Sequence, residues 1–151
     1  MTLVRISNTP YGLVLIMGLV SLFADMAHEG ARSITGPYMS VLGASGFVVS
    51  FVAGFGELLG NGLRIFSGYL TDKTKKYWLM AMTGYLINLV SVPLMGIAGG
   101  WRAMSALIFT ERVGKAIRTP ARDTIISYAA RKVGSGYSFG LHQAMDQVGS
   151  L

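Results

Sequence analysis

Charged and polar side chains recur at helical spacing inside segments that are otherwise apolar. Asp25, His28, Glu29 and Arg32 follow at intervals that place them on one face of a helix. Later segments repeat the pattern with Glu57, Asn61 and Arg64; with Glu111, Lys115, Arg118 and Arg122, beside which stands Arg112; and with His142 and Asp146. A charge at the centre of a bilayer costs at least ~2.5–3.5 kcal/mol, so these faces are expected to turn toward one another or toward a wet cavity.

Such faces have two interpretations, and the spacing leaves both open. Each residue could belong to a structural ion pair that holds helices in register. Alternatively, the faces line a pathway along which a polar solute or a proton moves, and their number favours a cavity, because packing alone needs fewer charges. The residues expected to line this pathway are Asp25, His28, Glu29, Arg32, Glu57, Asn61, Arg64, Arg112 and Lys115.

Other chemistry finds little support. His28 stands beside Glu29 and near Asp25, but a second histidine at ligand spacing is missing, so we expect no metal site. The sequence has neither a nucleophilic serine motif nor a phosphate-binding loop, so we expect neither an enzyme nor a cofactor. The absence of cysteine excludes disulfides and thiolate metal sites.

The composition indicates that lipid surrounds these segments. Of 151 residues, 52% are hydrophobic and 13% are charged, against roughly 25% charged residues in an average soluble protein. The net charge of +6 raises nucleic acid as a partner, but the cations fall in short turns or singly within apolar segments rather than on one basic face. We therefore expect a lipid bilayer, and no nucleic acid, as the partner surface.

The fold class expected is an all-α membrane protein built from antiparallel transmembrane helices. A spanning helix needs about 20 mostly apolar residues. Four segments qualify, at about residues 11–42, 46–71, 77–98 and 102–129, and an incomplete fifth begins at 137. Short links are expected at 43–45, 72–76, 99–101 and 130–136, with a kink or break at Gly36-Pro37 and bends at Pro93 and Pro120. Gly56 and Gly60 form a small-xxx-small pair that is typical of close helix packing.

The turn charges predict the orientation. Only Arg102 falls on one side of the expected membrane. The cations on the other side are Arg5, Lys73, Lys75, Lys76, Arg131 and Lys132. The positive-inside rule then gives a multi-pass protein of the plasma (inner) membrane with a cytoplasmic N-terminus.

Two motifs resemble those of one transporter family. Residues 68–76, Gly-Tyr-Leu-Thr-Asp-Lys-Thr-Lys-Lys, resemble the Gly-x-Leu-x-Asp-Arg/Lys-x-Gly-Arg/Lys signature between helices 2 and 3 of the major facilitator superfamily, although Lys75 stands where that signature has glycine. Residues 111–123, Glu-Arg-Val-Gly-Lys-Ala-Ile-Arg-Thr-Pro-Ala-Arg-Asp, look like the arginine-rich fourth-helix motif of a prokaryotic branch of that superfamily. Residues 23–27 and 141–146 look like the same branch.

This resemblance implies a twelve-helix transporter of two bundles that rock about a midplane site. The chain would form part of the N-terminal six-helix bundle. In the family, the turn and the end of helix 4 form a cytoplasmic gating network, which here would comprise Gly68, Asp72, Lys73, Lys76, Arg122 and Asp123. The resemblance also associates Arg112 with proton coupling or with the substrate's charge.

The function expected is secondary active transport of a small solute by alternating access, with protons as a candidate coupling ion. Because the chain stops at Leu151 inside a helical pattern, it is expected to be an N-terminal fragment or a truncated form, whose partner is the missing C-terminal portion or a second copy. The alternatives are a small homodimeric four-helix transporter and a non-transporting membrane remnant. The cations of the fourth helix fit either an anionic solute or counter-ions for acids.

Overall fold

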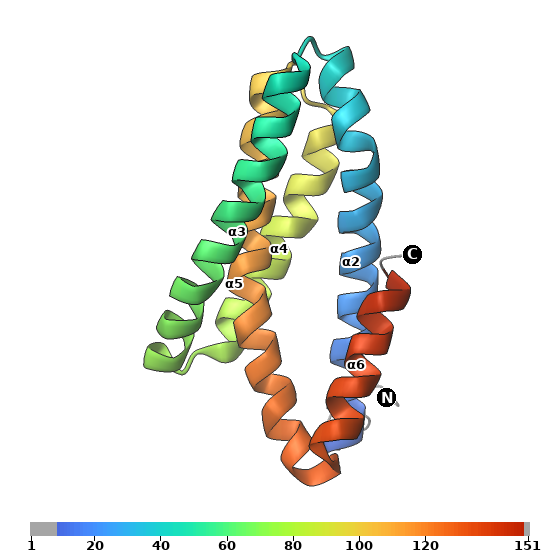
Figure 1. Cartoon of the computed structure of the whole chain (residues 1–151). Coiled ribbons are helices and arrows are strands. Elements are labelled where there is room, and N and C mark those ends of the chain that lie inside the picture. Colours follow the sequence, from blue (N-terminus) through green and yellow to red (C-terminus); the bar gives the residue numbers. More distant parts are fainter. Residues whose placement is uncertain (1–8, 150–151) are drawn as a thin grey trace. The chain divides into compact units, whose positions relative to one another are not determined.

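The computed structural model describes residues 9–149, which fold into five α-helices (Figure 1). These helices are α2 (Pro10–Val41), α3 (Gly46–Thr74), α4 (Tyr77–Gly96), α5 (Trp101–Val133) and α6 (Ser135–Gly149). They belong to two compact units. The central unit is residues 30–121, and the terminal unit is the described part of the two chain ends, residues 9–29 and 122–149. Arg5 and Leu151, which entered the predictions of orientation and truncation, lie outside the described residues.

Two of the links are shorter than the sequence predicted. The link expected at 72–76 contracts to Lys75 and Lys76, because α3 continues to Thr74, and the link expected at 130–136 contracts to Gly134, because α5 continues to Val133. Each helix ends on a residue with positive φ, +54° at Lys75 and +109° at Gly134. Such a residue ends a helix within one position, because its N–H turns back to a carbonyl of the last turn. The N–H of Lys75 donates to the Thr71 carbonyl at 2.9 Å, and that of Gly134 to the Ala130 carbonyl at 2.8 Å.

Three prolines lie within helices. Pro37 lies inside α2, Pro93 inside α4 and Pro120 inside α5. The break considered at Gly36-Pro37 is therefore absent, and α2 runs on to Val41. A proline removes one backbone hydrogen bond, a loss that membrane helices tolerate when neighbouring groups satisfy the freed carbonyl.

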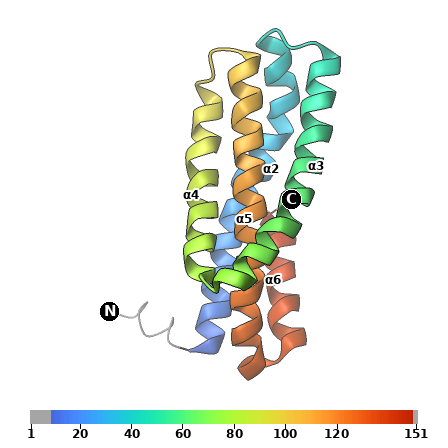
Figure 2. The same cartoon turned by 90° about the vertical axis from the view of Figure 1, so that its left-hand side faces the viewer.

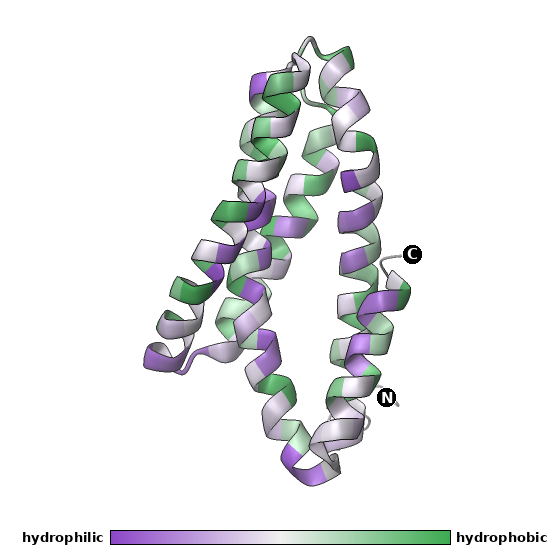
Figure 3. Cartoon of the chain, viewed as in Figure 1, coloured by the Kyte–Doolittle hydropathy of each residue, from purple (hydrophilic) through white to green (hydrophobic). Residues whose placement is uncertain are grey.

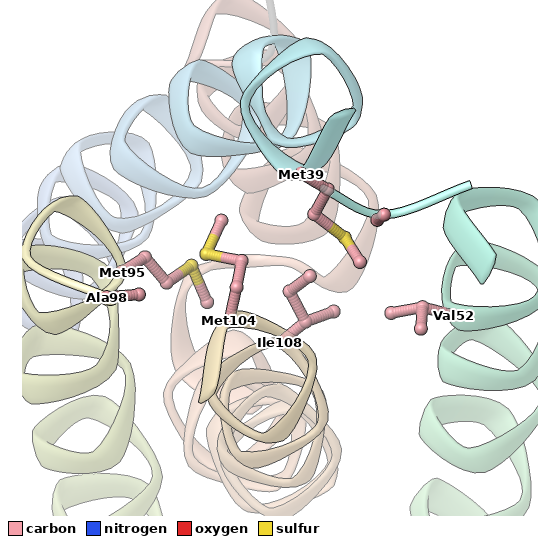
Figure 4. Packing of buried hydrophobic residues seen from close by; sticks show 7 residues of the cluster. Met39, Val52, Met95, Ala98, Met104 and Ile108 are labelled. Carbon is pink, nitrogen blue, oxygen red and sulfur yellow. The ribbon is translucent and has the colours of Figure 1, made fainter. Parts of the chain in front are cut away.

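The central unit has an apolar core where its four helical segments meet. Figure 4 shows Met39 of α2, Val52 of α3, Met95 of α4 and Met104 of α5 directed toward one another. Tyr38 adds a link from α2 to α4, since its hydroxyl donates to the Gly96 carbonyl at 3.3 Å. This core fixes one end of the unit and so sets the helix spacing at the charged residues farther along.

The first part of α5 lies against both α3 and α4 (Figure 2). Toward α3, the Ser67 hydroxyl donates to the Ala116 carbonyl at 2.6 Å. Toward α4, two glycines allow the backbones to approach: a Cβ added at Gly84 would lie 2.7 Å from the Gly114 oxygen, and one added at Gly114 would lie 3.0 Å from the Gly84 oxygen. Small residues at a crossing are typical of helix packing in membranes.

In the terminal unit, α6 runs parallel to the first part of α2. Tyr11 meets Tyr137 with ring centroids 6.4 Å apart. Farther along, Gly149 approaches the backbone of Leu22, where an added Cβ would lie 2.6 Å from the Leu22 oxygen. The contacts advance in the same direction on both helices, as expected of parallel neighbours.

Many large apolar side chains of the described residues are exposed while a set of polar ones is buried, as expected of helices that lie in lipid. Phe47 and Ile65 of α3, Leu89 of α4 and Ile97, which follows α4, are exposed. The buried polar residues of the central unit are Ser67, Thr71, Asn88, Ser91, Ser105, Glu111, Arg118 and Thr119. Figure 3 shows hydrophilic bands on α2, at the end of α3, along α5 and on α6, between hydrophobic or neutral stretches. The chain is an all-α membrane protein.

Within the described residues, α2, α3 and α4 are long and apolar enough to cross a membrane. The sequence predicted a fourth spanning segment at 102–129, and α5, which covers it, does not meet the same criterion. The reason is its charge, since Glu111, Arg112, Lys115 and Arg118 follow within eight residues. Instead, α5 packs against α3 and α4, so that these helices rather than lipid surround part of its charged stretch.

Candidate functional site

The central unit contains a cavity of about 120 Å³ among α2, α3 and α5. Its lining is polar and mostly charged, and it consists of Arg32, Glu57, Gly60, Asn61, Arg64, Arg112, Lys115, Ala116 and Thr119. Six of these were expected from the sequence to line a solute or proton pathway, namely Arg32, Glu57, Asn61, Arg64, Arg112 and Lys115. The structure gathers them around one space.

Glu57 lies at the centre of the charged contacts. Its Oε1 lies 3.3 Å from a terminal nitrogen of Arg32 on α2 and 3.0 Å from a terminal nitrogen of Arg112 on α5. The Glu57 side chain is 45% exposed and that of Arg32 is 53% exposed, whereas that of Arg112 is 11% exposed. The Glu57 carboxylate thus contacts both the largely buried guanidinium of Arg112 and the exposed guanidinium of Arg32, at the edge of the cavity.

Helix geometry explains why these groups converge. Glu57, Asn61 and Arg64 repeat at i, i+4 and i+7 on α3, so they share one face. The same helix carries Gly56 and Gly60, where an added Cβ would lie 3.7 Å from the Arg112 Cγ and 3.9 Å from the Arg112 Cβ, respectively. Both glycines therefore lie where α3 contacts Arg112 of α5, at distances that are ordinary for an added Cβ.

Positive charge exceeds negative charge in this lining. Its cations are Arg32, Arg64, Arg112 and Lys115, and its one carboxylate is that of Glu57. Glu111 adds a second carboxylate behind the cavity, because its Oε2 lies 3.8 Å from the Nε of Arg112. Even with Glu111 counted, the cations outnumber the carboxylates, so the cavity is a favourable place for an anion.

A buried polar contact between α4 and α5 was not foreseen. Asn88 lies on α4, which bears no charged residue, and its amide nitrogen lies 3.5 Å from Oε1 of Glu111, which is 3% exposed. Arg118 is fully buried nearby, and its guanidinium carbon lies 4.8 Å from the ring centroid of Tyr85. An asparagine within an apolar segment was the available signal for this contact, because a buried amide requires a hydrogen-bond partner.

Three expected pathway residues belong to the terminal unit. Asp25 and His28 are buried on α2, and the Nε2 of His28 lies 3.6 Å from Oε1 of Glu29. In the described residues, no group of three or more histidine, aspartate or glutamate side chains is placed to hold a metal ion. The pathway role expected for Asp25, His28 and Glu29 stays a prediction.

The residues expected to form the cytoplasmic gate fall at the end of α3. Asp72 and Lys73 occupy its last turn, and Lys76 precedes α4 as its N-terminal cap residue. Gly68 lies where a Cβ would be 3.7 Å from the Pro120 Cβ, so the gate motif begins at a contact with α5. Lys75, which stands where the similar signature has glycine, adopts the left-handed conformation that favours glycine.

The other two expected gate residues are in the terminal unit. Arg122 is buried, and its terminal nitrogens lie 3.1 Å from Oδ1 of Asp123 and 3.3 Å from Oδ2 of Asp146. Its NH1 group also donates to the Ser21 hydroxyl at 3.2 Å. Arg122 therefore joins α2, α5 and α6 within that unit. Its predicted pairing, together with Asp123, to Asp72 and Lys73 stays a prediction.

Known proteins resemble nearly the whole chain. An uncharacterized protein of Mycobacterium tuberculosis and one of Mycobacterium bovis are each 49% identical over 147 residues, which is 97% of this chain and 36% of the relative. An uncharacterized MFS-type transporter of Methanocaldococcus jannaschii is 33% identical over 140 residues, which is 91% of this chain and 34% of the relative. The chain thus spans about a third of the length of the curated relatives it matches.

Two further comparisons gave no match. The chain matches no family model. It also matches no solved structure.

Proposed function

We propose that this chain forms part of the N-terminal bundle of a major facilitator transporter, which moves a small solute across the membrane by alternating access. The observation that carries the proposal is the charged cavity among α2, α3 and α5 of an all-α membrane protein. A purely structural ion pair needs one cation and one carboxylate, whereas this cavity brings together five charged side chains around open space. The similarity to the archaeal MFS-type transporter supports the same assignment.

The chain matches only about a third of each relative's length. The transport activity is therefore proposed for the whole transporter and not for this chain alone. Major facilitator transporters place their site between two bundles near the bilayer midplane. In this proposal, the central unit supplies one side of that site. The Asp72 turn of the central unit and, separately, Arg122 of the terminal unit are proposed to take part in gating on the cytoplasmic side.

Uptake of an unbiased solute mixture tests the proposal. Vesicles from cells that produce the protein are incubated with a uniformly ¹³C-labelled cell extract, and the trapped label is identified by mass spectrometry. We expect at least one polar solute to be enriched over vesicles without the protein, and this enrichment to be lost in Arg112→Gln. Arg102→Gln is the matched control, because Arg102 is exposed, lies outside the cavity and contacts the ring of Trp101. No enrichment of any solute, or equal loss in both variants, would contradict the proposal.

Single cysteines test the proposed orientation, since the chain has none of its own. Lys76→Cys lies between α3 and α4, and Gly99→Cys lies between α4 and α5. With the N-terminus in the cytoplasm, a membrane-impermeant maleimide labels Gly99→Cys in intact cells and labels Lys76→Cys only after permeabilisation. The reverse pattern would overturn the orientation.

A further inference from the structure

We infer that the transported solute is a small oxyanion, carrying a carboxylate or phosphate group, and that Glu57 occupies the place of that group until the solute binds. This inference rests on the proposed function and specifies its substrate class. It begins from the excess of cations over carboxylates in the cavity lining. Such an excess of positive charge attracts an anion.

The contacts of Glu57 show how the anion would be held. A carboxylate oxygen of Glu57 already lies between Arg32 and Arg112, at 3.3 Å and 3.0 Å. The guanidinium fork matches carboxylate and phosphate oxygens equally well, so a solute oxyanion is suited to the same two groups. Arg64 and Lys115 line the same cavity and add attraction for a second negative charge.

The size of the cavity agrees with this class. Its volume of about 120 Å³ is somewhat below the ~150 Å³ of a cavity that holds benzene. It therefore admits a group of about four to six non-hydrogen atoms, such as a carboxylate with its neighbouring carbon atoms, or a phosphate. Because Glu57 and Arg32 are each about half exposed, the remainder of a larger solute can extend away from the cavity.

Equilibrium binding tests the inference separately from transport. The purified chain in detergent is titrated calorimetrically with inorganic phosphate and with succinate at constant ionic strength in chloride, and with choline as a cationic control. We expect saturable binding of at least one oxyanion and none of choline.

Two variants make the test specific. Glu57→Gln removes the carboxylate that competes for Arg32 and Arg112, so it should bind the oxyanion more tightly than wild type. Arg112→Gln should weaken binding about tenfold or more, the loss typical of a charge-assisted hydrogen bond, whereas Arg102→Gln should leave it unchanged. Arg32→Gln probes the same contact through a half-exposed side chain, should Arg112→Gln fail to fold.

The outcomes separate the two proposals. Binding of choline but of neither oxyanion would overturn the oxyanion assignment and leave transport intact. Binding of the oxyanion by Glu57→Gln that is no tighter than by wild type would overturn the role of Glu57. Absence of both binding and solute enrichment would remove the proposed function itself.

Discussion

Replacing Gly84 with alanine is expected to force α4 and α5 apart where they lie closest. The new methyl group would lie 2.6 Å from the Arg118 Cβ and 2.7 Å from both the Arg118 nitrogen and the Gly114 oxygen. Ordinary contact begins near 3.4 Å, so the overlap is about 0.7 Å with two backbone atoms that have no rotamer with which to withdraw. Overpacking of this kind destabilises by ~1–3 kcal/mol.

Gly54→Ala is the matched control for this substitution. Gly54 lies inside α3, and a Cβ added there meets nothing within 4 Å. Both substitutions gain the same helix propensity, roughly 0.5–1 kcal/mol, so the difference between the variants isolates the overlap, about 1–3 kcal/mol. The free energy of unfolding is measured by titrating the detergent-solubilised protein with SDS and following circular dichroism. Equal stability of Gly84→Ala and Gly54→Ala would refute the close approach of α4 and α5.

Two further substitutions test the helix ends and the terminal unit. Lys75→Gly should raise the free energy of unfolding by about 0.5–1 kcal/mol, because glycine relieves the left-handed strain but adds entropy to the unfolded chain; a decrease in the same SDS titration would contradict the cap geometry. Arg122→Gln should lower it by ~1–3 kcal/mol, because the partly buried carboxylate of Asp146 loses its arginine partner and keeps His142 beside it. The exposed Arg131→Gln should change it by less than ~0.5 kcal/mol, and Asp146→Asn added to Arg122→Gln should restore part of the loss.

Periodicity predicted the elements more reliably than it predicted their ends. Long apolar runs bounded by glycine and lysine clusters specify helices almost independently of context. The end of α3 was placed too early because Asp72, Lys73 and Thr74 were interpreted as a polar turn. The structure instead ends the helix on Lys75, a residue type that seldom adopts positive φ. Sequence preferences alone give little reason to choose lysine for that position.

The site could be predicted only in part, because spacing defines a face but not its neighbours. The periodicity of α3 placed Glu57, Asn61 and Arg64 on one side, and that side does line the cavity. Nothing in the spacing shows that Glu57 reaches both Arg32 and Arg112, since these distances depend on how closely α2, α3 and α5 pack. The spacing placed Glu111 on the charged face of α5 but did not predict its contact with Arg112 behind the cavity. Its contact with Asn88 was also not predicted, because α4 bears no charged residue that would indicate a pairing.

The burial of charge in α5 has a consequence for how the protein is made. A charged side chain at the centre of a helix adds ~2.5–3.5 kcal/mol to the free energy of insertion, and Glu111, Arg112, Lys115 and Arg118 all lie in this helix. The free energy of inserting α5 into lipid on its own is therefore unfavourable. During biogenesis, α3 and α4 must lie in the membrane or beside the translocon before α5 inserts. Glu57, Tyr85 and Asn88 can then contact Arg112, Arg118 and Glu111 of α5, respectively. Substitutions at those three residues would then reduce the yield of inserted protein before they affect any transport activity.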